Sequence, residues 1–295
     1  MNIYQQIAAN KRRSFFAISL FILFIVFISY VFGKIYGDSL SYTAIAFIFS
    51  GIAAFGSYYF SDQIILALSS AKPADPKKNF DFFTAVQNMS IASGLPMPKL
   101  YVISDTALNA FATGRDPKHA VIVATSGLLD KLERSEIEAV IAHEMSHIKN
   151  YDIQFMAIIA ILAGMIAYLA DFFMRSLWYK KQRSNRRESS FFLLLGIILA
   201  VLSPFIATII KLAVSRNREF LADATGALLT RNPLALASAL EKISEDQEVL
   251  EVASNATSHL YIINPFKGKE SAAWFASLFN THPPVEERIK ILRKM

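Results

Sequence analysis

Four long apolar runs constrain this chain more than any other feature of its sequence. They span 15–33, 41–60, 153–174 and 191–214, and each is close to the roughly 20 residues with which a helix crosses a bilayer. The composition agrees, because 54% of the residues are hydrophobic and 18% are charged, against about 25% charged in soluble proteins. We therefore predict a multi-pass α-helical membrane protein. A buried soluble hairpin is the alternative for the second pair of runs.

These runs divide the chain into four predicted parts. Residues 1–70 form an N-terminal membrane hairpin, and residues 153–214 form a second hydrophobic hairpin. Between and after them lie two polar portions, 71–152 and 215–295. We expect the two polar portions to build one soluble domain.

The first polar portion mixes helix and strand signals, whereas the second is mainly helical. β-Branched residues and Gly–Pro breaks predict a helix over 81–93, strands over 99–104 and 120–125, and a short extended stretch over 109–114. Ser135 with Glu138 three residues later predicts a capping box that starts the next helix. The predicted fold class is α+β, mostly helical with a small sheet.

Positive charge gathers beside the apolar runs. The chain carries +6 in total, and residues 1–13 contribute +3 while residues 175–189 contribute +5. Basic residues placed in this way lie next to a membrane and do not form a nucleic-acid surface, so we expect no nucleic-acid partner. They also predict that the N-terminus is cytoplasmic.

The chemistry is concentrated in His143-Glu-Met-Ser-His147, an H-E-x-x-H motif on the predicted capped helix. Residues i and i+4 share one helix face, so both imidazoles can ligate one zinc ion. Glu144 lies beside them and can act as the general base. Two solvated helix histidines are the bland alternative.

A catalytic zinc site needs a third protein ligand, and the chain has no cysteine. The third ligand must then be a carboxylate or one of His119, His259 and His282. Glu219 and Asp223 are again i and i+4 on a predicted helix, so one could ligate the metal while the other orients a ligand histidine. A solvated acidic pair balanced by neighbouring arginines is the competing interpretation. His119 and His259 are assigned no role.

The whole set of motifs resembles the HtpX-type membrane zinc metalloproteases, which are gluzincins related to the CAAX prenyl endopeptidases. The resemblance covers nearly the whole chain, including the order of the four apolar runs. It rests on the segments Asn109-Ala-Phe-Ala-Thr-Gly-Arg115, the H-E-x-x-H helix followed by Asn150 and Asp152, Ser215-Arg-Asn-Arg-Glu-Phe-Leu-Ala-Asp223, and Thr281-His-Pro-Pro-Val-Glu-Glu-Arg288.

The resemblance implies a role for each matching residue. His143, His147 and Glu219 would ligate one zinc ion per subunit, with Glu144 as catalytic base and Asp223 beside a ligand histidine. An edge strand would hold an extended substrate along Asn109, Ala110, Phe111 and Ala112. His282 and Arg288 lie in a matching motif without an assigned role there. The mechanism itself needs a donor to the oxyanion besides the metal, which His282 or Arg288 could supply, or either could contact the substrate; a loop residue packed beside Pro283 and Pro284 is the alternative for His282.

The resemblance also implies a zincin-like catalytic domain in a bacterial inner-membrane endopeptidase whose active site faces the cytoplasm. Its substrates would be misfolded, damaged or unfolded membrane proteins in quality control and stress response. The bilayer and other membrane quality-control proteases would be its further partners. Two alternatives remain: a narrow processing peptidase of the prenyl-protease type, and a catalytically silent membrane scaffold.

The charge of the loop at 175–189 conflicts with this topology. If both polar portions are cytoplasmic and the second hairpin crosses fully, this basic loop lies outside, against the positive-inside tendency. We expect four crossings, and the alternative is a second hairpin that enters the bilayer without crossing it.

Overall fold

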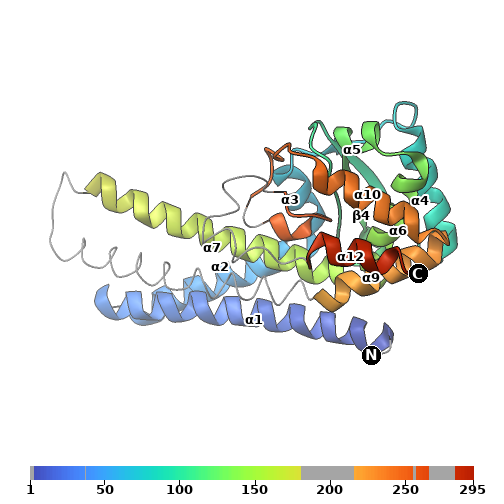
Figure 1. Ribbon diagram of the computed structural model, residues 1–295. Coiled ribbons are helices and arrows are strands. Elements are labelled where there is room, and N and C mark those ends of the chain that lie inside the picture. The colour runs from blue at the N-terminus through green and yellow to red at the C-terminus, as the bar shows by residue number, and fades with distance from the viewer. Residues whose placement is uncertain (1–2, 37, 181–215, 255–256, 266–282) are drawn as a thin grey trace.

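The computed structural model describes residues 3–36, 38–180, 216–254, 257–265 and 283–295. A globular part and a long helical arm make up the molecule (Figure 1). Helices α1 (Ile3–Tyr36), α2 (Ser39–Tyr59) and α7 (Asp152–Lys180) lie side by side in the arm. The N-terminal end of α1 runs back beneath the globular part (Figure 1).

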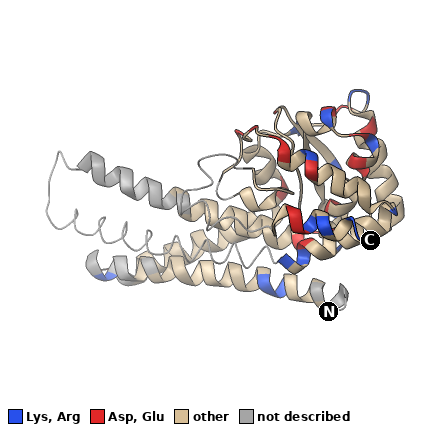
Figure 2. Ribbon diagram, in the orientation of Figure 1, with Lys and Arg blue, Asp and Glu red and all other residues tan. Residues whose placement is uncertain are grey.

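The described side chains on the surface of the arm are mostly apolar. Large side chains on α1 and α2 are open to the surroundings, among them Phe15 at 67%, Phe27 at 63% and Phe49 at 69% exposure. Charged residues gather on the globular part and on α1 beneath it, while the described part of the arm is mostly uncharged (Figure 2). An exposed apolar surface of this extent indicates contact with a membrane or a partner.

One helix in the described part of the chain is long and apolar enough to cross a membrane by itself, namely Leu40–Tyr59. It coincides with the second expected run. The first and third runs, 15–33 and 153–174, lie within α1 and α7. The fourth, 191–214, lies outside the described residues.

A four-stranded mixed sheet forms one layer of the globular part, in the order β1-β2-β4-β3. Its strands are β1 (Lys72–Pro73), β2 (Lys99–Ile103), β3 (Ala110–Thr113) and β4 (Val121–Thr125). Strands β2 and β4 pair in parallel, while β3 pairs antiparallel with β4, for example Phe111 with Val123. The strands expected from the sequence are confirmed, and β3 lies at the edge of the sheet.

Helices pack on this sheet and complete a largely helical domain. They are α3 (Ser61–Leu68), α4 (Phe80–Ser93), α5 (Ser126–Lys131), α6 (Arg134–Lys149), α9 (Arg216–Thr230), α10 (Pro233–Glu245) and α12 (Val285–Leu292), with short 3₁₀ turns at η1 (Pro117–His119) and η2 (Ser258–Leu260). Helix α6 is the central element, since it packs against α4, α9, α10 and β3. Twelve of its residues, from Glu136 onward, are buried.

The helix boundaries follow local signals, with one correction. Helix α4 ends at Gly94, whose left-handed φ of 70° suits glycine. Helix α6 begins earlier than the sequence indicated: its N-cap is Glu133, and the Glu136 carboxylate accepts a hydrogen bond from the Glu133 backbone N–H at 2.8 Å. The expected box at Ser135 is therefore wrong by two residues, because this acidic stretch offers two N-cap residues, each with Glu three positions later.

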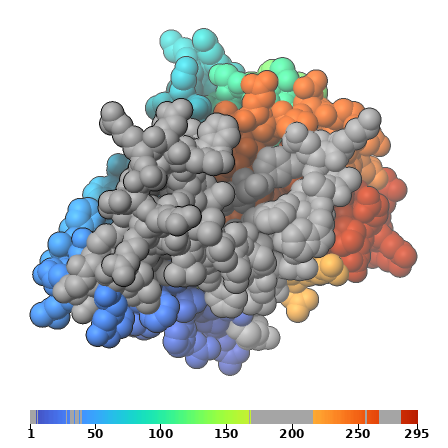
Figure 3. Space-filling model, turned by 90° about the vertical axis from the view of Figure 1, so that its left-hand side faces the viewer, coloured from blue at the N-terminus to red at the C-terminus, as the bar shows by residue number. Residues whose placement is uncertain are grey.

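A sharp bend joins the globular part to the arm. Helices α6 and α7 meet at 83°, and the chain turns between them through Tyr151, whose φ is 59°. The arm thus begins one turn after the H-E-x-x-H motif. Viewed from the end of the arm, the N-terminal residues lie at the lower left and the C-terminal residues at the right (Figure 3).

Candidate metal centre

His143 and His147 lie one turn apart on the buried face of α6. The helix presents both imidazoles on the same side, and their Nε2 atoms converge to 3.2 Å. Both side chains are almost completely buried. Local helix geometry alone therefore creates this pair.

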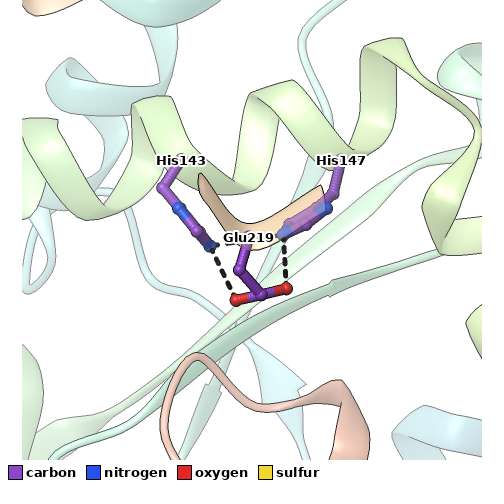
Figure 4. A group of neighbouring side chains, drawn as sticks. All are labelled: His143, His147 and Glu219. Atoms are coloured by element: carbon purple, nitrogen blue, oxygen red, sulfur yellow. Dashed lines mark hydrogen bonds and ion pairs between the residues drawn. The ribbon is translucent and has the colours of Figure 1, made fainter. Parts of the chain in front are cut away.

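Helix α9 brings Glu219 to the two histidines (Figure 4). Its carboxylate oxygens lie 3.8 Å from Nε2 of His143 and 3.5 Å from Nε2 of His147. The close approach of α9 to α6 depends on small residues. A Cβ at Gly226 would lie only 3.1 Å from the backbone nitrogen of His143, so a side chain there requires the neighbouring backbone to shift by a few tenths of an ångström.

Each histidine is oriented by an aspartate on its other ring nitrogen. Nδ1 of His143 lies 2.9 Å from Asp223, and Nδ1 of His147 lies 3.1 Å from Asp152. When the neutral rings donate Nδ1–H to these carboxylates, both Nε2 lone pairs face Glu219. Three acceptors then share one buried space, an arrangement that a cation stabilises.

The spacing of these acceptors fits zinc. Bonds of about 2.0–2.2 Å to nitrogen and oxygen in a tetrahedral site place neighbouring ligand atoms about 3.3 Å apart. The three distances here, 3.2, 3.5 and 3.8 Å, bracket that value. Among the described residues, His143, His147 and Glu219 are the group of metal-ligand side chains with this mutual proximity.

Protonation of His147 reflects the negative charge around it. Burial alone would lower its pKa, but the hydrogen bond with Asp152 and the nearby Glu219 and Glu144 carboxylates raise the pKa to about 9. In the metal-free protein the His147 ring therefore carries a proton on both nitrogens at neutral pH. A metal ion must displace the proton on Nε2 in order to bind.

Glu144 lies beside the histidines without joining the ligand group. It is buried, and loss of hydration raises its pKa above the ordinary value despite the neighbouring histidines. The backbone of Ala112, on edge strand β3, lies close enough to the Glu144 carboxylate to offset part of this rise in its pKa. The group thus lies between the ligand cluster and the sheet edge, with the raised proton affinity that suits an acid–base group.

Arg288, from α12, is fully buried behind the metal cluster. Its guanidinium donates to both oxygens of Asp223 at 2.7 and 2.8 Å and to the backbone oxygen of Ile262 at 3.0 Å. It also lies 3.6 Å from Glu219. Although burial opposes its charge, these carboxylates raise the pKa of Arg288. Arg288 thus holds the carboxylates of Asp223 and Glu219 in place.

A second buried network supports the other histidine, and sequence reasoning did not find it. Asn10 of α1 donates to Asp152 at 2.7 Å and to the backbone oxygen of Asn150 at 3.0 Å. Arg218 also donates to Asp152, at 3.1 Å. The first turns of the chain are therefore hydrogen-bonded to the aspartate that orients His147. Only the spacing of Asp152, five residues after His147, hinted at this partnership.

The expected substrate strand is present but partly covered. Asn109, Ala110, Phe111 and Ala112 are all buried, and β3 pairs with β4 on one side only. On the other side, Ile262 donates its backbone N–H to Ala110 at 3.0 Å, and the Asn109 side chain donates to Ile263 at 3.1 Å. Of the four residues, Ala112 is the one directed at Glu144.

Two other histidines, His119 and His259, lie apart from the metal cluster. His119 is exposed and pairs with Asp116 at 2.8 Å. His259 is buried in η2, where its Nε2 lies 3.1 Å from the backbone oxygen of Met156. His282 lies outside the described residues.

The geometry can be compared with known proteins. The sequence pattern of the family described as "Peptidase family M48" matches residues 76–295, which include every residue of the candidate metal centre except Asn10. The chain belongs to peptidase family M48. It is 43% identical to a "Protease HtpX homolog" from Caldanaerobacter subterraneus subsp. tengcongensis over 99% of this chain and 98% of that protein. Another from Streptococcus uberis is 41% identical over 99% of this chain and its whole length.

A solved structure supports the fold of this M48 chain. The crystal structure of Ste24p from S. mikatae superposes with a TM-score of 0.51 at 20% identity, covering 98% of this chain and 66% of that one. The resemblance to HtpX-type proteases expected from the motifs is confirmed by the comparisons. Together with the His-His-Glu cluster, they identify a protease of the metallo type.

Proposed function

We propose that this chain is a membrane-bound zinc endopeptidase with one zinc ion per subunit. His143, His147 and Glu219 would hold the ion, and Glu144 would be the catalytic base. The observation that carries this proposal is the convergence of three buried acceptors beside a fourth carboxylate that is not a ligand. When bound, zinc supplies Lewis-acid chemistry that activates water and polarises a peptide carbonyl.

The protein's own residues then handle the proton. Glu144 takes a proton from the attacking water and delivers it to the leaving amine, a role helped by its raised pKa. Asp223 and Asp152 keep the imidazoles in the tautomer that ligates through Nε2. Arg288 holds Asp223 and Glu219 in place, so its contribution to the oxyanion would act through these groups.

Substrate would add to β3 as an extended strand. In an antiparallel pair the backbone groups alternate between the partner and the open side, so Ala110 and Ala112 face away from β4. Because the Ala110 carbonyl already accepts a hydrogen bond from Ile262 and the Ala112 backbone N–H is turned toward Glu144, we assign the substrate contact to the Ala112 carbonyl. Recognition through backbone groups reads little side-chain identity, which suits misfolded or unfolded proteins.

The proposed setting is a bacterial inner membrane, with the site facing the cytoplasm and acting in quality control under stress. The two hydrophobic hairpins, 1–70 and 153–214, would anchor both halves of the catalytic domain, 71–152 and 215–295. Supporting this, α7 begins directly after the H-E-x-x-H helix. The metal centre would then lie near the bilayer surface, within reach of membrane-embedded substrates.

Labelling of single cysteines tests this topology, because the natural chain has none. One cysteine replaces Ser184 in the basic loop, and a control replaces Ser254. A membrane-impermeant thiol reagent on intact cells should label only the cysteine at 184. Labelling at 254 would overturn the cytoplasmic site, and labelling at neither position would indicate a second hairpin that does not cross.

Activity is tested on purified wild type and Glu144→Gln, with metal analysis and a casein-type cleavage assay. The wild type should contain zinc and cut casein, whereas Glu144→Gln should retain zinc and lose turnover. Near-normal cleavage by zinc-loaded Glu144→Gln would contradict the mechanism. Cleavage of a lipidated peptide but not of casein would favour a narrow processing peptidase.

A further inference from the structure

A cavity of about 1060 Å³ opens where the arm meets the globular part. Its walls come from α1, the end of α2, the turn after β3 and the start of α7. No residue of the candidate metal centre lines it. We propose that this cavity binds the headgroup of an anionic phospholipid of the phosphatidylglycerol class. The inference rests on the membrane location proposed above, and it is independent of the peptidase chemistry.

The charge of the cavity favours a phosphate group. Three cations line it, Lys11, Arg115 and Lys118, against a single acid, Asp116. Arg115 is already engaged, since it donates to the backbone oxygen of Tyr59 at 3.0 Å and contacts His119. Lys118 is exposed and has no ion pair among the described residues. Lys11 and Lys118 thus supply two cations for an anion in the cavity.

Two buried polar atoms in the same walls lack partners. Ser14 is 3% exposed and Gln154 is 5% exposed, and neither Ser14 Oγ nor Gln154 Oε1 has a hydrogen-bond partner in the described part of the chain. Buried polar groups are normally satisfied, so these two atoms leave one donor and one acceptor for a bound molecule. The serine hydroxyl can donate to a phosphate oxygen. The amide oxygen needs a donor, which the hydroxyls of a glycerol headgroup provide and a choline headgroup lacks.

The position of the cavity matches the headgroup layer. Lys11 and Ser14 directly precede the apolar run 15–33, and Tyr58 lies at the end of the run 41–60. Phe15 and Ile18 continue the wall of the cavity along α1 into the apolar run, and Phe15 is 67% exposed. Aromatic residues are enriched at this level of a bilayer, and basic pockets between membrane helices bind acidic headgroups. Acyl chains would follow this apolar wall.

Binding is measured on the full-length protein, delipidated in detergent and carrying Glu144→Gln so that self-cleavage cannot intervene. Native mass spectrometry counts added phosphatidylglycerol or phosphatidylcholine of matched chains. Flotation with vesicles reports separately whether each variant still inserts. The test variants are Lys118→Gln, which removes an exposed cation, and Gln154→Met, which removes the amide at similar volume. Lys77→Gln with Lys78→Gln is the control, since these lysines do not line the cavity.

Phosphatidylglycerol should bind wild type in preference to phosphatidylcholine, and each test variant should bind it about tenfold more weakly, the effect of losing one strong polar contact. The control should bind as wild type does. Equal binding by wild type and both test variants, or equal binding of the two lipids, would overturn the proposal. So would displacement of the lipid by an equal concentration of glycerol phosphate or of an unfolded peptide, which would assign the cavity to a soluble phosphate or to substrate.

Discussion

Replacing Asn10 by alanine should weaken zinc binding, although Asn10 lies on α1, far from the H-E-x-x-H motif in sequence. Its amide donates to Asp152 at 2.7 Å and to the Asn150 backbone oxygen at 3.0 Å, and both acceptors belong to buried residues. A hydrogen bond to a charged group contributes about 1.5–3 kcal/mol, and a buried acceptor left unpaired costs about 1–3 kcal/mol. The substitution should therefore reduce the docking free energy of α1 by roughly 2.5–6 kcal/mol.

Part of this loss of free energy affects the metal ligand His147, because Asp152 orients its ring from 3.1 Å. Changes to such outer partners typically cost 10–100-fold in metal affinity. Arg218 still holds Asp152 at 3.1 Å, so we expect the lower end, about tenfold. The assay is competition for zinc with a chelator of known affinity at fixed pH.

Asn88→Ala is the matched control. Asn88 also donates to a carboxylate, Glu138, at 2.9 Å, but this bond is exposed and outside the metal centre. It should leave zinc affinity unchanged within about twofold, as expected for exposed contacts. Wild-type zinc affinity in Asn10→Ala would refute the coupling between α1 and the metal centre, and an equal loss in Asn88→Ala would show a general effect of stability.

Three further predictions concern packing and protonation. Gly226→Ala should lower zinc content, because its Cβ would lie 3.1 Å from the His143 backbone. Overpacking costs about 1–3 kcal/mol, against a gain of about 1 kcal/mol in helix propensity. Unchanged zinc content would show that α9 can shift freely. Burial would raise the pKa of Glu136, but hydrogen bonds from Lys242 and Ser238 hold the pKa below its usual 4.5. The ionised Glu136 carboxylate therefore stabilises the folded state fully above pH 4.5, and this contribution is lost as pH falls through the lowered pKa. Acid unfolding of Glu136→Gln should lack this pH-dependent loss of stability. Because the pKa of His147 is about 9, zinc affinity should rise with pH up to about pH 9, by at most about tenfold per pH unit. A zinc affinity that does not change with pH in chelator competition would contradict the assignment of His147 as a ligand.

The sequence predicts well the features that local geometry determines. The i, i+4 spacing of His143 and His147 produces a convergent pair on any helix. The β-branched runs at 99–104 and 120–125 form the central strands, β2 and β4. The cap of α6 was misplaced because neighbouring positions in the acidic stretch satisfy the same pattern.

Long-range packing is the part that the residues alone could not provide. Spacing left the third acceptor open among Glu219, Asp223 and three histidines, because α6 and α9 are separated in sequence by the apolar runs 153–174 and 191–214. The position of Glu219 depends on the contact at Gly226, which no local pattern reveals. Asn10 and the burial of Arg288 were missed for the same reason, since each depends on the docking of a distant helix.

An anomalous-diffraction map of the purified protein, recorded at the zinc absorption edge, tests the metal centre most directly. We predict a single zinc peak per chain, within about 2.0–2.2 Å of Nε2 of His143, Nε2 of His147 and a Glu219 oxygen. Crystals of Glu219→Ala should show this peak reduced or absent. A zinc peak bonded to other residues, or full occupancy in Glu219→Ala, would contradict the central claim.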